Sequence, residues 1–358
     1  MNPSVPPARR SNTLSSSLGL GEKLFASSDE RRFATAIEKG LDEVEAGLLS
    51  HMAFADEIAD ATSRYLLEAG GKRVRPVLAL LTAQLGDGNN ADVVTAAQAV
   101  EITHLASLYH DDVMDEAQLR RGVPSAQNVW GNSVAILTGD LLFARASKLI
   151  AGLGSEALIL QSNTFERLCL GQLHETLGPK PDENPVEHYL QVLADKTGSL
   201  IATAAEVGVK FSNAPREYTV PVRDFGEKIG VAFQLIDDVI DLSAETGKTG
   251  KKPGTDLRSG VATLPLLYLR ELALTDSDAA ELLTRIERDV NANFYGEGDE
   301  AAIDAAVTDL REHPVTKKTL DEARRWGREA VEALAPLPDG SVKKALTRFA
   351  ESIVERSN

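Results

Sequence analysis

The sequence predicts an all-α protein folded as a single helical domain. Alanine and leucine dominate its 358 residues, and the alternation of β-branched residues typical of strands is rare. Proline and glycine gather in a handful of short segments, which leaves long helical stretches between them. Hydrophobic residues form 43% of the chain, enough for a large core. We therefore expect roughly ten or more helices in one domain that spans residues 22–358.

Composition excludes several classes of protein. Residues 1–21 are rich in Ser and Pro and lack the apolar core of a secretory signal, so we expect a flexible tail. No segment approaches about 18 uninterrupted apolar residues, so we expect no transmembrane span. A net charge of −16 argues against a nucleic-acid partner. Cys169, the single cysteine, is expected to be a small buried hydrophobe in a reducing compartment, which favours the cytoplasm.

Two copies of one acidic pentapeptide stand out in the predicted helices. They are Asp111-Asp112-Val113-Met114-Asp115 and Asp237-Asp238-Val239-Ile240-Asp241. Residues i and i+4 share a face of a helix, so Asp111 lies above Asp115 and Asp237 above Asp241. A single motif of this kind is equally well explained as a solvated acidic face. Two matching copies, each followed by apolar residues and a basic loop, favour a functional site.

The aspartates predict a metal site. Like charges at i and i+4 destabilise a helix, and a second motif near the first would add repulsion unless cations lay between them. Carboxylate oxygens are hard ligands of the kind that Mg²⁺ prefers, and protein-bound Mg²⁺ usually binds phosphates on its other side. We therefore expect the ligand of this site to be phosphorylated.

Basic segments that could hold phosphate follow the predicted helix ends. Gly70–Pro76, with sequence GGKRVRP, ends one helix and opens the next, so its amides and cations could meet an anion. Arg120 and Arg121 follow the first acidic motif, and Arg offers a bidentate fork to phosphate. Alternatively, these are a helix cap and ordinary surface arginines.

Two further segments add cations. The loop Thr246–Asp256 resembles a phosphate-binding loop in composition but lacks the spacing of a P-loop. Lys196-Thr197-Gly198 lies at a predicted break between helical stretches. His104 precedes Asp111 by two helical turns and so faces the same side. The remaining histidines, such as His174 and His188, have no such phase and are expected to be packed or solvated.

Taken in order, these segments resemble the trans-isoprenyl (polyprenyl) diphosphate synthases. The resemblance is carried by GGKRVRP, HLASLYHDDVMDEAQLRRGVPS, KTG, FQLIDDVIDL and GKKPGTD, and it runs from about residue 30 to the C-terminus. It implies an all-α bundle of the isoprenoid synthase type around a central active-site cavity. It also implies condensation of isopentenyl diphosphate with an allylic diphosphate, with three Mg²⁺ ions when substrate is bound.

The resemblance also assigns roles to residues. Metal ligation, direct or through water, would fall to Asp111, Asp112, Asp115, Asp237, Asp238 and Asp241. Contacts with the allylic diphosphate would fall to Arg120, Lys196, Thr197, Gln234 and Lys251. Isopentenyl diphosphate would be held by Lys72, Arg75, His104 and Arg121. One departure is Val261, which stands where the family usually has a lysine before Thr-Leu-Pro.

Two small side chains predict a long product. In the family that this chain resembles, the growing prenyl chain extends beside the first motif, and residues one turn earlier form the floor of its channel. Ala106 and Ser107 occupy those positions, where an aromatic side chain would stop elongation. We therefore expect a product longer than about C20, in the C35 to C50 range of quinone side chains such as that of menaquinone. The alternative is that another helix sets the floor.

Other functions are also compatible with parts of the sequence. A shorter-chain geranylgeranyl diphosphate synthase would share every motif. A terpene cyclase binds one diphosphate substrate and would have no function for GGKRVRP and the arginine pair. A non-catalytic subunit of a heteromeric synthase would usually lack aspartates in one of the two motifs, and this chain has all six. A metal-dependent phosphohydrolase would need no isopentenyl diphosphate. The resemblance further implies a homodimer, with transient membrane contact on release of a long prenyl product.

Overall fold

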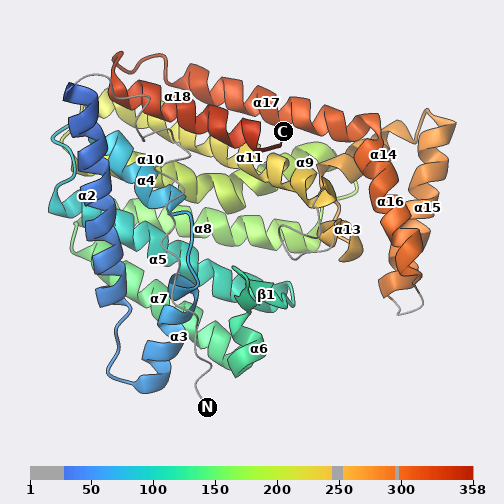
Figure 1. The fold of residues 1–358 in the computed structure, drawn as a ribbon, viewed down its shortest axis with the longest axis horizontal. Helices are drawn as coiled ribbons and strands as arrows, with labels where there is room; N and C mark the ends of the chain where they lie inside the picture. Colours follow the sequence, from blue (N-terminus) through green and yellow to red (C-terminus); the bar gives the residue numbers. More distant parts are fainter. Residues whose placement is uncertain (1–27, 244–252, 295–297, 358) are drawn as a thin grey trace. The chain divides into compact units, whose positions relative to one another are not determined.

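The computed structural model describes residues 28–243, 253–294 and 298–357 (Figure 1). Over these ranges the regular structure is helical apart from one short two-stranded ladder, so the predicted all-α class is confirmed. The predicted tail, residues 1–21, lies outside the described residues. Contacts divide the chain into two compact units, and the single domain expected over residues 22–358 stays a prediction.

The first unit comprises Met1–Glu166, Leu200–Gly226 and Ala333–Phe349. Its N-terminal elements are α2 (Ser28–His51), α3 (Glu57–Glu68), α4 (Val74–Ala83), α5 (Ala91–Met114), β1 (Leu119–Arg120), β2 (Val123–Pro124), α6 (Ala126–Trp130) and α7 (Asn132–Ala151). α8 (Ser155–Leu177) begins in this unit, which also holds nearly all of α10 (Ser199–Phe211), η2 (Arg216–Tyr218) and the start of α11 (Thr219–Ser243).

Local sequence explains where these helices begin. The Asp56 carboxylate accepts from the backbone N–H groups of Ile58 and Ala59 at the start of α3, and the Asn90 side chain caps α5 in the same way. Such caps satisfy amides that have no partner within the helix. α5 is buried along most of its length and packs against α7, which fits its apolar composition on all sides. The first acidic motif therefore lies at the end of a largely buried helix.

α4 and α10 lie in direct backbone contact in the same unit. Thr82 Oγ1 donates to the carbonyl of Ala205 over 2.8 Å. A Cβ added at Gly208 would lie 2.1 Å from the carbonyl oxygen of Ala79, so only glycine fits there. This close approach holds α4 in place, and the basic segment GGKRVRP leads into that helix.

The second unit comprises Arg167–Ser199, Glu227–Glu332 and Ala350–Asn358. It holds the end of α8, α9 (Pro185–Leu193), η1 (Ala194–Gly198), the C-terminal part of α11, α13 (Thr255–Arg258), α14 (Leu264–Leu272), α15 (Ser277–Phe294), α16 (Glu300–Glu312) and nearly all of α17 (Pro314–Ala333). A buried cluster that includes Leu235, Leu269 and Ile303 forms its core. The core fixes α9, α11 and α14 against one another.

The C-terminal segments are α18 (Ser341–Val354) and η3 (Glu355–Ser357). α18 buries Val342, Leu346, Phe349 and Ile353, so one face of this helix packs against the rest of the protein. Within the described ranges, no helix combines the length and the apolarity needed to cross a bilayer, as the sequence predicted.

One sequence expectation about burial was wrong. Cys169 was expected in the core because its neighbours Leu168 and Leu170 are apolar, but its side chain is exposed on α8. Leu168 points inward and Leu170 is exposed as well. Neighbouring positions on a helix differ by about 100° in direction, so an apolar run does not assign each member to the core.

Candidate active site

The first acidic motif lies at the C-terminal end of α5. α5 ends at Met114, and the backbone N–H of Asp115 donates to the carbonyl of Asp111 over 2.8 Å, so these two residues are one turn apart as predicted. Asp111 is half-buried and Asp115 is exposed. A helix C-terminus carries partial negative charge, so carboxylates placed there favour a bound cation.

The middle aspartate of this motif points inward. Asp112 has no exposed side-chain surface and pairs with Arg120 over 2.6 Å. Its Oδ2 is buried without a hydrogen-bond partner among the described residues. Burial raises the pKa of Asp112, and the neighbouring Arg120 opposes that rise. Arg120 therefore neutralises a buried carboxylate as well as standing beside the motif.

The arginine pair sits in a hairpin that the sequence did not predict. Leu119–Arg120 pairs with Val123–Pro124, and Arg121 and Gly122 form the turn with φ of 55° and 80°. Positive φ at both positions is typical of a type I′ hairpin, where glycine fits readily. This turn sends the two adjacent arginines to different partners.

Arg121 reaches the end of α3. Its guanidinium donates to the carbonyl of Leu66 over 2.7 Å and to that of Gly70. Burial lowers the pKa of Arg121 to about 10, with further lowering from Arg73 and Arg75 and a raising effect from Glu101. A cluster of half-buried cations of this kind is a place where an anion is stabilised.

The basic segment is held by an arginine that sequence reasoning missed. α3 ends at Glu68, and Gly70 and Gly71 carry φ of 101° and 156° before α4 begins at Val74. Arg73 adopts a left-handed conformation and pairs with Glu45 of α2 and, over 3.3 Å, with Glu101 of α5. The predicted change from one helix to the next is confirmed.

The two neighbours of Arg73 differ in exposure. Lys72 is exposed, whereas Arg75 is half-buried, and its buried Nε has no hydrogen-bond partner among the described residues. Burial lowers the pKa of Arg75, and Glu101 opposes this. Glu101 was also missed, although a lone acid in the apolar run of α5 was the signal that could have revealed it.

His104 lies on α5 in a strongly basic environment. Burial, with the surrounding charges of Arg75, Arg121, Arg120 and Arg73, holds the pKa of His104 well below its ordinary value of 6.5. The imidazole is therefore neutral at pH 7 and offers one N–H donor and one acceptor.

The two predicted chain-length residues lie next to His104 on α5. Ala106 is fully buried and Ser107 nearly so. Ser107 Oγ donates to the carbonyl of His104 over 2.9 Å. Both side chains are small, as the sequence shows, and any larger residue at position 106 must move its neighbours.

The second acidic motif lies in the last turns of α11. Asp237 and Asp241 are half-buried, and Asp238 is buried. Burial raises the pKa of Asp238 to about 8, against the lowering effect of a hydrogen bond from Tyr189. Asp241 Oδ2 accepts the backbone N–H of Asp256 over 3.1 Å, which ties the following segment to the motif.

The remaining predicted residues that the structure describes belong to the same unit as this motif. The predicted helix break at Lys196 is a π-helical turn, Ala194–Gly198. Lys196 pairs with Glu175 of α8 over 2.5 Å, while Thr197 and Gln234 are half-buried. Val261 is exposed, and Lys251 with most of its loop lies outside the described residues.

The predicted residues divide between the two units. The residues from Lys72 to Arg121 belong to the first unit, and those from Lys196 to Asp241 belong to the second. Considering only described residues, no three His, Cys, Asp or Glu side chains are grouped so that they could hold a metal ion. The donors are nevertheless carboxylate oxygens, the type that suits Mg²⁺.

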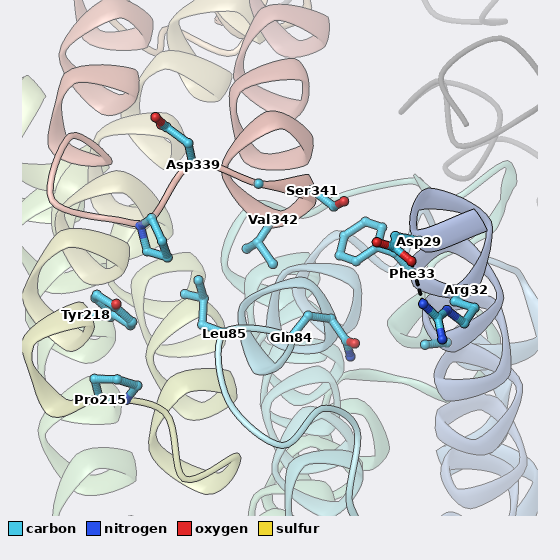
Figure 2. A pocket seen from close by; sticks show the side chains of 13 residues that line it. Asp29, Arg32, Phe33, Gln84, Leu85, Pro215, Tyr218, Asp339, Ser341 and Val342 are labelled. Atoms are coloured by element: carbon cyan, nitrogen blue, oxygen red, sulfur yellow. Dashed lines mark hydrogen bonds and ion pairs between the residues drawn. The ribbon is translucent and has the colours of Figure 1, made fainter. Parts of the chain in front are cut away.

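A separate groove lies in the first unit. It has a volume of about 580 Å³ and is formed by the start of α2, the end of α4, η2 and the turn before α18 (Figure 2). Phe33, Leu85, Tyr218 and Val342 are among its lining residues. Its described lining includes none of the residues that the sequence predicted for the site.

Comparison with known proteins gives the family. The model of the polyprenyl synthetase family matches residues 56–294, which is more than half of the chain. The chain belongs to the polyprenyl synthetase family. It is therefore a transferase of the prenyl diphosphate synthase class, and the resemblance recognised in the sequence is confirmed.

Relatives extend this match over nearly the whole chain. The nonaprenyl diphosphate synthase of Mycobacterium tuberculosis is 43% identical over 326 residues, covering 90% of this chain and 94% of that protein. A polyprenyl synthase from Caulobacter crescentus, solved with calcium and isoprenyl diphosphate, has a TM-score of 0.80 and 31% identity, with 92% and 98% coverage.

A third match comes from a shorter-chain synthase. The geranylgeranyl pyrophosphate synthase from Corynebacterium glutamicum, also solved with calcium and isoprenyl diphosphate, has a TM-score of 0.77 and 37% identity, with 93% and 99% coverage. Members of the polyprenyl synthetase family that make long and short products are thus both similar to this chain. The identity values indicate the reaction class and do not distinguish between product lengths.

The lowered pKa of His104 predicts a pH dependence of stability. Below about pH 6.5 His104 takes up a proton in the unfolded chain but stays neutral in the folded chain. The unfolded state is therefore favoured increasingly as the pH falls, and the free energy of unfolding decreases. Between pH 7.5 and 5.5, wild type should lose about 1 kcal/mol more unfolding free energy than His104→Gln. Urea denaturation measures this difference, and equal losses would contradict the prediction.

Proposed function

We propose that this enzyme joins isopentenyl diphosphate head-to-tail to an allylic diphosphate and makes a trans-polyprenyl diphosphate. The observation that carries the proposal is the pair of aspartate motifs at the ends of α5 and α11, in a chain that also carries two separate basic segments. Two anionic substrates need two sets of counter-charges. A hydrolase or a cyclase has no use for the second set.

We assign the allylic diphosphate to the acidic motifs and their basic neighbours. Asp111, Asp115 and Asp237 are the proposed ligands of Mg²⁺, supported by Asp112, Asp238 and Asp241. When bound, Mg²⁺ would neutralise the diphosphate and stabilise the charge that develops on the leaving pyrophosphate. Similar proteins solved with calcium and isoprenyl diphosphate support a divalent ion. Arg120, Lys196, Thr197, Gln234 and Lys251 are the proposed direct contacts with the same diphosphate.

We assign isopentenyl diphosphate to the basic segment of the first unit. Lys72 and Arg75 supply charge, and the buried Arg75 Nε is a donor ready for an anion. Arg121 lies in the same cation cluster, and neutral His104 can donate one hydrogen bond. Holding the substrate by its diphosphate orients its double bond as the nucleophile, so much of the catalysis is positioning.

Departure of pyrophosphate is the step that the chain's cations must assist. The allylic C–O bond breaks, and the electron pair leaves with the diphosphate oxygen. Fixed Arg and Lys side chains aimed at that oxygen are worth more than mobile water, because they need no reorganisation. Arg120 is already oriented by Asp112, which limits the entropy it loses on binding.

The direct test is condensation by the purified protein. With Mg²⁺, labelled isopentenyl diphosphate and allylic primers of ten, fifteen or twenty carbons, we expect polyprenyl diphosphates, and EDTA should abolish them. Asp111→Asn should lower kcat by about 10² to 10³-fold, as expected when a transition-state charge loses its support. Asp92→Asn, an exposed position in the first turn of the same helix, is the matched control. Absence of condensation with every primer would refute the proposed function.

We propose further that the product is longer than C20, in the C35 to C50 range used for quinone side chains such as that of menaquinone. Ala106 and Ser107 on α5 support this, because neither side chain can block a prenyl chain growing past the first motif. The similarity to a nonaprenyl diphosphate synthase supports it as well.

A bulky residue at this position should shorten the product. Ala106→Phe should shift the main product below that of wild type while the first condensation with the shortest primer continues, since the ring obstructs only the growing end. Chromatography of the dephosphorylated products measures length. Ser107→Ala, which adds no bulk, should leave the distribution unchanged. Products of wild-type length from a folded Ala106→Phe enzyme would refute the role of this position.

We also propose that the enzyme is a homodimer. α8 exposes Ile159, Leu170, Leu173 and Leu177, which lie at spacings that keep them on one helix face. Large apolar side chains gathered on one face favour burial against another molecule. A second copy of the chain is the proposed occupant.

Charge on this face should separate the subunits. Leu173→Glu combined with Ile159→Glu should convert the dimer into a monomer, since a buried interface does not tolerate unpaired carboxylates. Light scattering coupled to size-exclusion chromatography measures the mass. Leu274→Glu, at an exposed position after α14, is the control and should leave the mass unchanged. A wild-type monomer would contradict the proposal.

A further inference from the structure

Each acidic motif turns its middle aspartate away from the other two. Residue i+1 lies about 100° around the helix from residue i, so it cannot share the face of i and i+4. In the first motif Asp112 is buried against Arg120. In the second motif Asp238 is buried against Tyr189. The outer aspartates remain more accessible in both motifs.

Tyr189 holds the second motif from α9. Its hydroxyl donates to Asp238 Oδ2 over 2.8 Å, where Asp238 is buried and Tyr189 is half-buried. Asp238 also accepts the backbone N–H of Leu264, the first residue of α14. The carboxylate is therefore fixed from two helices, and rotation of the end of α11 would break both bonds.

The same helix leads directly to the proposed diphosphate contacts. α9 ends at Leu193, and the π-helical turn Ala194–Gly198 follows without interruption. Lys196 and Thr197 lie in that turn. A bond from Tyr189 to Asp238 thus joins the segment that carries a cation to the segment that carries the acids, within one unit.

We propose that Tyr189 is a positioning residue for the diphosphate–metal site: its hydrogen bond to Asp238 fixes the last turns of α11 relative to the Lys196 turn, so that Asp237 and Asp241 are presented correctly. This inference rests on the proposed function. Tyr189 touches neither substrate nor metal in this role. It acts through Asp238, and its hydroxyl is the only group that the role requires.

Removal of that hydroxyl gives a direct test. Tyr189→Phe keeps the ring in the core cluster and deletes the bond. Leaving a buried carboxyl oxygen without its hydrogen-bond donor typically costs enough for an effect of about tenfold. We expect about tenfold weaker binding of inorganic pyrophosphate in the presence of Mg²⁺, measured by calorimetry. The Mg²⁺ concentration for half-maximal condensation should rise, while the KM for isopentenyl diphosphate should stay unchanged.

Two controls separate positioning from loss of packing. Tyr268→Phe alters a second tyrosine buried in the same core cluster and should bind pyrophosphate like wild type. Asp238→Asn and the double variant Tyr189→Phe/Asp238→Asn complete a mutant cycle. The double variant should bind no worse than Asp238→Asn alone, since the two groups act as one unit. Additive losses would show that the tyrosine acts independently and would overturn the proposal.

The outcomes distinguish this inference from the proposed function. If wild type condenses its substrates and Tyr189→Phe binds pyrophosphate and Mg²⁺ equally well, the positioning role is wrong and the proposed function stands. If wild type neither condenses nor binds pyrophosphate with Mg²⁺, the proposed function is wrong, and the positioning role falls with it. Thermal unfolding of each variant identifies any loss that comes from misfolding.

Discussion

Repulsion between carboxylates at helix C-termini is the constraint on which the organisation of this enzyme depends. Asp111 and Asp115 lie in and just after the last turn of α5, and Asp237 and Asp241 lie near the end of α11. The C-terminal end of a helix already carries partial negative charge, so each carboxylate placed there destabilises the folded protein. Cations would relieve this cost, and the proposed binding of Mg²⁺ with the diphosphate would supply them.

The protein limits this repulsion by giving one carboxylate of each motif an internal partner. Arg120 neutralises Asp112 in the first motif, whereas Tyr189 and the Leu264 amide satisfy Asp238 in the second. The two solutions differ in charge. An arginine favours the carboxylate form directly, while a phenol only donates a hydrogen bond, and burial accordingly raises the pKa of Asp238 to about 8.

In the basic segment of the first unit, the repelling charges are positive and the internal partner is an acid. Several arginines lie near His104, and their mutual repulsion needs a counter-charge inside the protein. Glu101 supplies it, pairing with Arg73 and acting on Arg75 and Arg121. Because Arg73 pairs with acids inside the protein, we assign it a structural role. Lys72 and Arg75, which lie on either side of it in the sequence, are the residues proposed to bind substrate. Charge compensation by Glu101 lowers the cost of holding these cations together, and the proposed anionic substrate would lower it further.

The sequence by itself determined the fold class and the positions of both acidic motifs, because helical periodicity and local spacing need only residues near one another. The reaction family came from the resemblance of its motifs to those of the trans-isoprenyl diphosphate synthases. Only the tertiary structure decided what each charge contacts. The hairpin that separates Arg120 from Arg121, the pairing of Arg73 with Glu101 and the bond from Tyr189 to Asp238 join distant segments. Cys169 was misplaced for a related reason, since its exposure depends on which face of α8 is covered. Partners of this kind depend on packing between helices, and no local pattern encodes it.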